Sequence, residues 1–238
     1  MTRSPADPAA AGSSAATAFL PDGQGWESVA VTDLPDDLLR LARSVKGFLP
    51  DDEADALRSA AATHLTPGGV MVEIGTYCGK STIHLGHVAR EAGATLVTVD
   101  HHRGSEENQV GWEYHDAELV DPETGVFDTL PRFRRAMLDA GLEDVVVPVV
   151  ARSTTVAAFW RTPVDVVFVD GGHTDEHAGN DYAGWSPWVR PGGALLIHDV
   201  FPDPADGGQA PYRIYLRALD DGFVEQPGTG SLRVLRRP

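Results

Sequence analysis

Short apolar runs alternate with amphipathic stretches along most of the chain. The apolar runs are rich in β-branched residues, as in buried parallel strands, and cover 70–74, 95–99, 145–150, 164–169 and 194–197. Stretches with apolar residues three or four positions apart predict helices at 34–48, 51–65, 82–92, 127–141, 174–188 and 212–219. Two last runs, 223–225 and 232–235, predict a hairpin. This alternation predicts an α/β fold with helices on both faces of a largely parallel sheet.

The chain of 238 residues is long enough for one large α/β domain. Residues 1–25 are rich in Ala, Ser, Pro, Gly and Thr and lack periodicity, which predicts a flexible N-terminal arm. Residues 26–238 are expected to form a single domain. Within it, two helices at about 33–65 precede the first strand, and a polar insertion at about 103–125 interrupts the alternation.

A glycine-rich loop follows the first predicted strand. Residues 70–82 read V-M-V-E-I-G-T-Y-C-G-K-S-T, which predicts a strand, a tight turn and the start of a helix. Gly75 and Gly79 carry no side chain, so the backbone there can approach a ligand closely. The next strand ends in Asp100, where a carboxylate can accept hydrogen bonds from both hydroxyls of a ribose. Together these features predict a nucleoside site.

The residues of this loop distinguish between two kinds of nucleoside cofactor. A dinucleotide-binding loop reads G-x-G-x-x-G and holds a pyrophosphate at a helix N-terminus. The loop here reads E-I-G-T-Y-C-G, and the carboxylate of Glu73 would repel a phosphate but suits a cationic amino-acid group. An NAD-dependent oxidoreductase is therefore an alternative that Glu73 and Tyr77 contradict. A non-catalytic scaffold that retains the cofactor fold is a second alternative.

The loop resembles motif I of the class I S-adenosylmethionine-dependent methyltransferases, E-x-G-x-x-x-G, and the resemblance extends over about 45–238. It implies a Rossmann-like seven-stranded methyltransferase sheet with a terminal antiparallel hairpin, and S-adenosylmethionine as the cofactor. The indicated cofactor-binding residues are Glu73, Gly75, Tyr77, Gly79, Ser81, Asp100, His101, Arg152, Ser153 and Asp170. In methyltransferases of similar layout, helices before the first strand cover the substrate side or form a homodimer contact, and the sequence leaves both roles open.

Two neighbouring predicted strands lead into acids and histidines. The fourth strand is followed by D-G-G-H and the fifth by H-D, so Asp170, His173, His198 and Asp199 should meet at one edge of the sheet. Carboxylates and water are the ligands that Mg²⁺ prefers, while imidazole suits transition metals better. We therefore predict a divalent-metal site for Mg²⁺ with Asp170 and Asp199 as ligands. The alternative is that Asp170 bridges to the cofactor and His198 is a core histidine.

The spacing of this cluster resembles the metal-dependent sugar O-methyltransferases of antibiotic and methylated-polysaccharide pathways and their cephalosporin-hydroxylase-like relatives. Those proteins usually carry an acid where this chain has His198, which makes His198 a candidate third metal ligand and leaves that position open. A hydroxyl activated by a metal also needs a base to take its proton. His173 is the predicted catalytic base, and His198 is the second choice.

The insertion after Asp100 mixes aromatic rings with neutral and acidic hydrogen-bonding groups. This chemistry is typical of sites that bind sugars, and a loop of this length is commonly a lid or a binding loop. The predicted substrate-binding residues are Gln109, Trp112, Glu113 and Tyr114. We expect the acceptor to be a small sugar or an oligosaccharide, with its anomeric 1-hydroxyl as the most acidic position. A non-sugar natural product and a merely solvated insertion are the alternatives.

Composition and charge narrow the partners further. The chain has 19 Lys and Arg against 35 Asp and Glu, and the formal net charge of -16 opposes binding to nucleic acid. The single cysteine, Cys78, cannot form an intrachain disulfide, and we expect it to fill space in the glycine loop rather than act as a nucleophile. No long apolar stretch or signal peptide is present, so we expect a cytoplasmic protein that does not bind a membrane.

Overall fold

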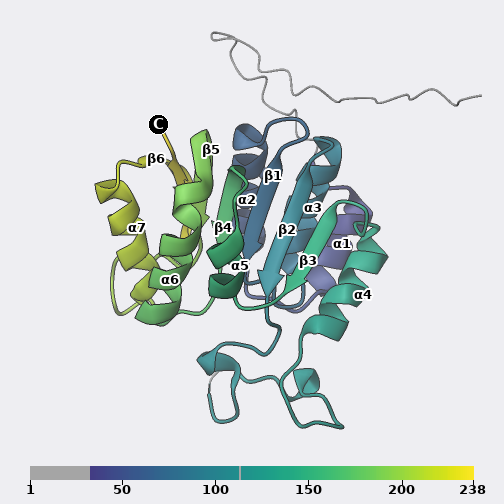
Figure 1. Ribbon diagram of the computed structural model, residues 1–238. Helices are drawn as coiled ribbons and strands as arrows, with labels where there is room; N and C mark the ends of the chain where they lie inside the picture. The colour runs from purple at the N-terminus through teal and green to yellow at the C-terminus, as the bar shows by residue number, and fades with distance from the viewer. Residues whose placement is uncertain (1–32, 113) are drawn as a thin grey trace, which may run out of the picture.

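The computed structural model describes residues 33–112 and 114–238, so the predicted arm at 1–25 lies outside the described residues. Within this part of the chain a seven-stranded sheet has the order β3-β2-β1-β4-β5-β7-β6 (Figure 1). The strands are β1 (Val70–Ile74), β2 (Thr95–Asp100), β3 (Val146–Val150), β4 (Val164–Val169), β5 (Val189–Ile197), β6 (Val224–Thr229) and β7 (Leu232–Arg236). β1 to β5 are parallel, whereas β7 runs antiparallel to β5 and β6. The predicted seven-stranded sheet with a terminal hairpin is confirmed.

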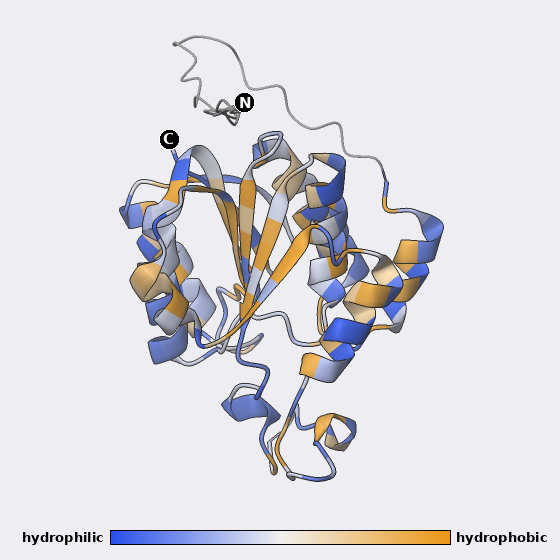
Figure 2. Cartoon of the chain, turned by 45° about the vertical axis from the view of Figure 1, so that its right-hand side comes forward, coloured by the Kyte–Doolittle hydropathy of each residue, from blue (hydrophilic) through white to orange (hydrophobic). Residues whose placement is uncertain are grey.

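Helices cover both faces of the sheet. One face packs against α1 (Asp36–Ser44), α2 (Asp51–His64), α3 (Lys80–Glu91) and α4 (Leu130–Ala140), and the other against α5 (Ser153–Phe159), α6 (Asp175–Trp185) and α7 (Ala210–Asp220). Successive strand residues enter opposite cores, as Met71 and Val72 do, so the sheet is largely hydrophobic between helices with hydrophilic outer faces (Figure 2). Among the helices described, none is long and apolar enough to cross a bilayer.

The structure differs from the predicted elements at two informative places. A helix that the sequence did not predict, α5, begins at Ser153, because its seven residues are too few to display a helical period. β5 begins at Val189, five residues before the predicted strand at 194–197, and includes the R-P-G-G segment, whose residues are typical of turns. The pairing with β4 is irregular there, since Val164 pairs with Val189 and Val166 with Ala194. The turn residues therefore form an irregularity inside the strand.

The carboxyl ends of the parallel strands form the lower edge of the sheet in Figure 1, and the insertion lies below this edge. The insertion contains two short 3₁₀ turns, η1 (Glu106–Asn108) and η2 (Ala117–Leu119), and an antiparallel bridge joins Val120 to Phe127. The fold thus gathers the glycine loop, the ends of β4 and β5, and the insertion around one edge of the sheet.

Candidate active site

A cavity of about 860 Å³ lies at this edge. Its wall combines residues that follow β1 to β5 with part of the insertion and with the 46–49 loop between α1 and α2. β1 pairs with β2 on one side and with β4 on the other, and ligands of open α/β sheets bind at such a reversal of strand order. The predicted site residues found in the wall are Gly75, Tyr77, Ser81, Asp100, His101, Gln109, Tyr114, Arg152, Ser153, Asp170, His173 and Asp199.

The glycine loop between β1 and α3 has a conformation that requires glycine. Gly75 has a φ of +85°, and a Cβ atom there would lie 2.1 Å from the carbonyl oxygen of Asp170. Gly79, which lies outside the cavity wall, precedes α3 with a φ of +95°. Cys78 is buried, and burial raises the pKa of its thiol to about 12, which is incompatible with a nucleophile at neutral pH. The loop therefore offers backbone, not a reactive side chain, to the cavity.

Asp100 is oriented by backbone N–H groups. Its Oδ2 accepts hydrogen bonds from the amides of Thr76 (2.9 Å) and Tyr77 (3.0 Å), and its Oδ1 accepts one from the amide of His102 (2.7 Å). The neighbouring His101 also lies in the cavity wall, and burial lowers the pKa of its imidazole. Oδ2 of Asp100 also accepts a hydrogen bond from the hydroxyl of Thr76 at 3.3 Å, so the acceptor position that remains for a ribose hydroxyl is on Oδ1.

Glu73 supports the loop from behind the cavity wall. Its carboxylate is fully buried and accepts hydrogen bonds from the hydroxyls of Ser81 (2.5 Å) and Thr82 (2.7 Å) at the start of α3. Burial raises the pKa of Glu73 to about 8, and the two hydroxyls oppose that rise. Ser81 itself lies in the wall. Direct contact between Glu73 and a cofactor amino group stays a prediction.

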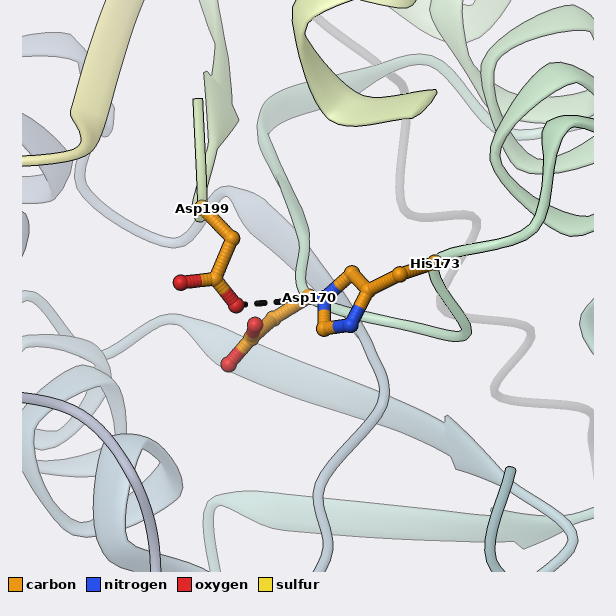
Figure 3. Close-up of side chains that lie close together, drawn as sticks. All are labelled: Asp170, His173 and Asp199. Carbon is orange, nitrogen blue, oxygen red and sulfur yellow. Dashed lines mark ion pairs between the residues drawn. The ribbon is translucent and has the colours of Figure 1, made fainter. Parts of the chain in front are cut away.

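Asp170, His173 and Asp199 come together on the other side of the cavity (Figure 3). Asp170 follows β4, Asp199 follows β5, and candidate ligand atoms of the three side chains lie within 4.8 Å of one another. His173 Nε2 lies 3.1 Å from Oδ2 of Asp199, and His173 Nδ1 lies 3.0 Å from Oε2 of Glu107 in the insertion. Burial alone would lower the pKa of His173, but these carboxylates raise it to about 9.

His198 lies behind this cluster and outside the cavity wall. Its Nε2 lies 2.7 Å from Oε2 of Glu53, and its Nδ1 lies 3.1 Å from Asp170 and 3.4 Å from Asp199. Burial opposes the charged form, but the surrounding carboxylates raise the pKa of His198 to about 12. Both ring nitrogens thus face carboxylates, and the four predicted residues do lie together at this edge, with His173 in the cavity wall and His198 behind it. The role of His198 as a third ligand or a base stays a prediction.

Glu53 is a member of this cluster that the sequence analysis did not identify. Its Oε1 accepts a hydrogen bond from the amide of Ser231 (2.8 Å), and its Oε2 accepts one from the hydroxyl of Ser231 (3.0 Å). Burial would raise the pKa of Glu53, but His198 and Ser231 hold it below its ordinary value. In the sequence, Glu53 belongs to a D-D-E run of the kind that stabilises a helix N-terminus. Glu53 lies one helical turn before Leu57, which belongs to the hydrophobic core, and this spacing was the sequence feature that indicated a buried position for Glu53.

The insertion reaches the cavity through some of its predicted residues. Gln109 lies in the wall, and its amide donates to two backbone carbonyls of the insertion, both at 3.0 Å. Tyr114 also lies in the wall and packs edge-on against Phe48 of the 46–49 loop, with ring centroids 5.2 Å apart. Trp112 is 59% exposed and lies outside the wall, and Glu113 lies outside the described residues. Phe48 was not identified from the sequence.

The donor set of Asp170, His173 and Asp199 fits a divalent cation. The two carboxylates supply the oxygen ligands that Mg²⁺ and Mn²⁺ prefer, and the imidazole is acceptable to Mn²⁺. All three side chains face the cavity, which has room for water ligands. The imidazolium of His198 offsets part of their negative charge from behind.

The sheet order, the glycine loop after β1 and the acid at the end of β2 define the class I methyltransferase fold. The methyltransferase domain family matches residues 72–200, more than half of the chain, from β1 to the end of β5. The chain belongs to this methyltransferase family. The prediction of a methyltransferase enzyme is thereby confirmed, in place of the alternative of an NAD-dependent oxidoreductase.

Solved structures with the same fold include O-methyltransferases. The O-methyltransferase NovP has a TM-score of 0.59 and 16% identity, over 77% of this chain and 78% of NovP. TomG from Streptomyces achromogenes, in complex with S-adenosylmethionine, has a TM-score of 0.55 and 17% identity, over 89% of this chain and 94% of TomG. The SAH-bound methyltransferase PaMTH1 from Podospora anserina has a TM-score of 0.58 and 16% identity, over 86% and 89%. At these identities the likeness shows a shared fold.

Proposed function

We propose that the protein is an S-adenosylmethionine-dependent O-methyltransferase that methylates a hydroxyl of a small sugar or an oligosaccharide with the help of a divalent cation. The observation that carries this proposal is the position of the Asp170, His173 and Asp199 cluster, which shares one cavity with the glycine loop and Asp100. A methyl donor bound at the loop and a hydroxyl bound at the cluster would therefore meet in that cavity.

The methyl donor is assigned to the part of the cavity between the glycine loop and Asp100. All of the residues assigned to it line the cavity: Asp100 would bind the ribose, Ser81 would lie toward the amino-acid end, and Arg152 and Ser153 would flank the adenine. TomG and PaMTH1 share the fold and were solved with S-adenosylmethionine and SAH, which supports this choice of cofactor.

The acceptor hydroxyl is assigned to the acid and histidine cluster. Asp170 and Asp199 would hold the cation, which polarises a bound hydroxyl and lowers its pKa. His173 would then act as the base and leave the cation to the two acids: with Asp199 bound to the cation, Nε2, which now lies 3.1 Å from Asp199, would take the proton, while Nδ1 stays with Glu107. Asp199 and Asp170 are two of the carboxylates that raise the pKa of His173 to about 9, and they are the groups whose charge a cation would neutralise. With that charge neutralised, the pKa of His173 would fall and the imidazole would become available as a base.

A hydroxyl-rich, uncharged acceptor agrees with the walls of this part of the cavity. Gln109 and Glu107 present hydrogen-bonding groups, and Tyr114 presents an aromatic face. The net charge of -16 disfavours anionic acceptors. The anomeric hydroxyl of a free sugar is its most acidic hydroxyl, so one cation and one imidazole would activate that oxygen most readily.

A non-sugar aromatic hydroxyl is the second candidate acceptor. One observation favours it, namely the contact of Phe48 with both Tyr77 and Tyr114, at ring-centroid distances of 5.5 Å and 5.2 Å. These three rings line the cavity and would also bind the face of a planar substrate.

A transfer assay with methyl-labelled S-adenosylmethionine tests the proposal. Sugars, oligosaccharides and phenols are offered to the wild type, to Asp199→Asn and to Asp139→Asn, whose exposed side chain lies on α4. We expect label in a sugar, loss of turnover with a chelator and recovery with Mg²⁺ or Mn²⁺. Asp199→Asn should lower turnover by about 100-fold, as removal of one group that stabilises a developing charge commonly does, and Asp139→Asn should not. Label confined to phenols would refute the sugar acceptor, and full turnover of metal-free protein would refute the role of the cation.

A further inference from the structure

A second cavity, of about 430 Å³, lies between the 46–49 loop and the insertion, and we call it the outer cavity. Part of its wall also belongs to the active-site cavity, including the aromatic rings of Phe48, Tyr77 and Tyr114. The rest of its wall lies outside the active-site cavity and consists of His115, Asp116 and Ala117. The two cavities are therefore neighbours that meet at the three rings.

The rings between the two cavities are held in place without being buried. Phe48 is 59% exposed and Tyr114 is 45% exposed, and exposed apolar surface of this kind marks a binding site. Phe48 contacts both tyrosine rings, and Tyr77 in turn packs against the buried ring of Phe127. Tyr77 also has a φ of +48°, a conformation that costs energy for a residue with a bulky side chain. The chain thus maintains an aromatic surface that its own core does not cover.

Polar groups with free hydrogen-bonding positions surround these rings. Within the described residues, the hydroxyls of Tyr77 and Tyr114 have no hydrogen-bond partner. Burial raises the pKa of Tyr77 to about 12, so its hydroxyl keeps its proton and can donate it. Nδ1 of His115 lies 2.9 Å from the carbonyl oxygen of Asn108, which leaves Nε2 for a ligand. The ligand that fits this wall has an apolar face and hydrogen-bonding groups around its edge.

The insertion connects the outer cavity to the acid and histidine cluster. The amide of Tyr114 donates to the carbonyl oxygen of Glu107 at 3.2 Å, and the side chain of Glu107 lies 3.0 Å from His173. The side-chain amide of Asn108 donates to the carbonyl oxygen of Tyr114 at 3.3 Å. The ring that borders the outer cavity and the carboxylate that faces the proposed base thus belong to one hydrogen-bonded turn. Because Tyr114 and His173 both line the active-site cavity, one molecule can contact the cluster and extend to the rings.

We propose that the outer cavity binds the second sugar residue of a disaccharide or longer acceptor whose first residue lies at the cluster. The inference rests on the proposed function, because it requires a sugar hydroxyl as the methyl acceptor. A pyranose ring has a face of C–H bonds that packs on aromatic rings, and hydroxyls at its edge that can pair with the two tyrosine hydroxyls and with Nε2 of His115. A planar hydrocarbon would cover the rings but would leave these polar groups without partners, at a cost in affinity.

Transfer of labelled methyl groups from S-adenosylmethionine to a series of sugars tests the proposal on the full chain. Glucose and galactose are compared with maltose, isomaltose and lactose, and kcat/KM is measured for each sugar. For the wild type, at least one disaccharide should exceed both hexoses by about 10-fold or more, as expected for ring packing together with one or two hydrogen bonds. A hexose that carries a benzyl ether in place of the second sugar should show a smaller gain.

Two variants and a matched control locate the gain at the outer cavity. Phe48→Ala removes a ring between the cavities, and His115→Ala removes a polar group that lines only the outer cavity. Each should reduce the preference for that disaccharide over the better hexose at least threefold. The control is Phe159→Ala, because the ring of Phe159 is 63% exposed on α5 and lines neither cavity. It should keep the wild-type preference.

The outcomes separate this inference from the proposed function. If a hexose accepts the label and no disaccharide exceeds it by about 10-fold, the inference is overturned while the sugar acceptor stands. The inference is also overturned if either Phe48→Ala or His115→Ala keeps the wild-type preference, or if the benzyl ether matches the disaccharide, which would assign the outer cavity to an aromatic group. If no sugar accepts the label, the proposed acceptor fails and the inference fails with it. The wild-type comparison requires no variant to fold, and thermal unfolding reports whether the variants are folded.

Discussion

Replacing Glu53 by Gln would remove a buried negative charge that faces an imidazolium. The side chains of Glu53 and His198 are 7% and 3% exposed, so solvent screens their interaction little. Whichever way the new amide is turned, its NH₂ group meets a donor, either the amide of Ser231 or Nε2–H of His198. Breaking a buried pair by removing one partner costs about 3–5 kcal/mol, because the other charge remains buried. We expect Glu53→Gln to lower the free energy of unfolding by about this amount.

The loss should depend on pH in a direction set by the two pKa shifts. The pKa of His198 is raised to about 12, so its contribution to stability is complete below about 6.5 and declines as pH rises toward 12. The pKa of Glu53 is lowered, so its contribution is present above its ordinary pKa of about 4.5 and is lost as pH falls. The difference in stability between the wild type and Glu53→Gln should therefore be largest near pH 5–6 and smaller at pH 9.

Chemical and thermal unfolding of the metal-free protein at pH 6 and pH 9 provide the measurement. For a chain of this size, 3–5 kcal/mol corresponds to a fall in Tm of roughly 6–20 °C. The control is Asp52→Asn, an exposed acid in the same helical turn, which should change stability by no more than about 1 kcal/mol. A loss below 1 kcal/mol for Glu53→Gln, or a loss that is the same at both pH values, would refute the reasoning.

Two further predictions concern the loop and the insertion. Gly75→Ala should abolish cofactor binding and destabilise the fold by several kcal/mol in urea unfolding, because its Cβ would collide with the Asp170 carbonyl. The control is Gly93→Ala, at a φ of +60° with open space around it, which should cost only about 1–2 kcal/mol of backbone strain. Glu107→Gln should lower kcat by about 10- to 100-fold through misorientation of His173, with unchanged affinity for S-adenosylhomocysteine. Equal kcat for Glu107→Gln and the exposed control Glu123→Gln would contradict a positioning role.

The order of helices and strands could be predicted from the sequence because each element carries its own period. The bounds of β4, Val164–Val169, agree with the apolar run that predicts it, and α2 ends within one residue of its prediction. The glycine loop and Asp100 were also identified from the sequence, because a parallel strand always delivers its last residue to the same edge of the sheet. Such features depend on neighbours in the chain, so the sequence alone determined them.

Only the tertiary structure decided which groups complete the site. Glu53 and His198 are 145 residues apart in the chain, and Glu107 and His173 are 66 apart. Ser153 and Asp181, 28 residues apart, meet only because α5 and α6 pack on the same face of the sheet. An acid on a helix has the same sequence pattern whether it faces solvent or a buried imidazole. Its partner, and with it the pKa and the role, is set by how distant elements pack, which no local period encodes.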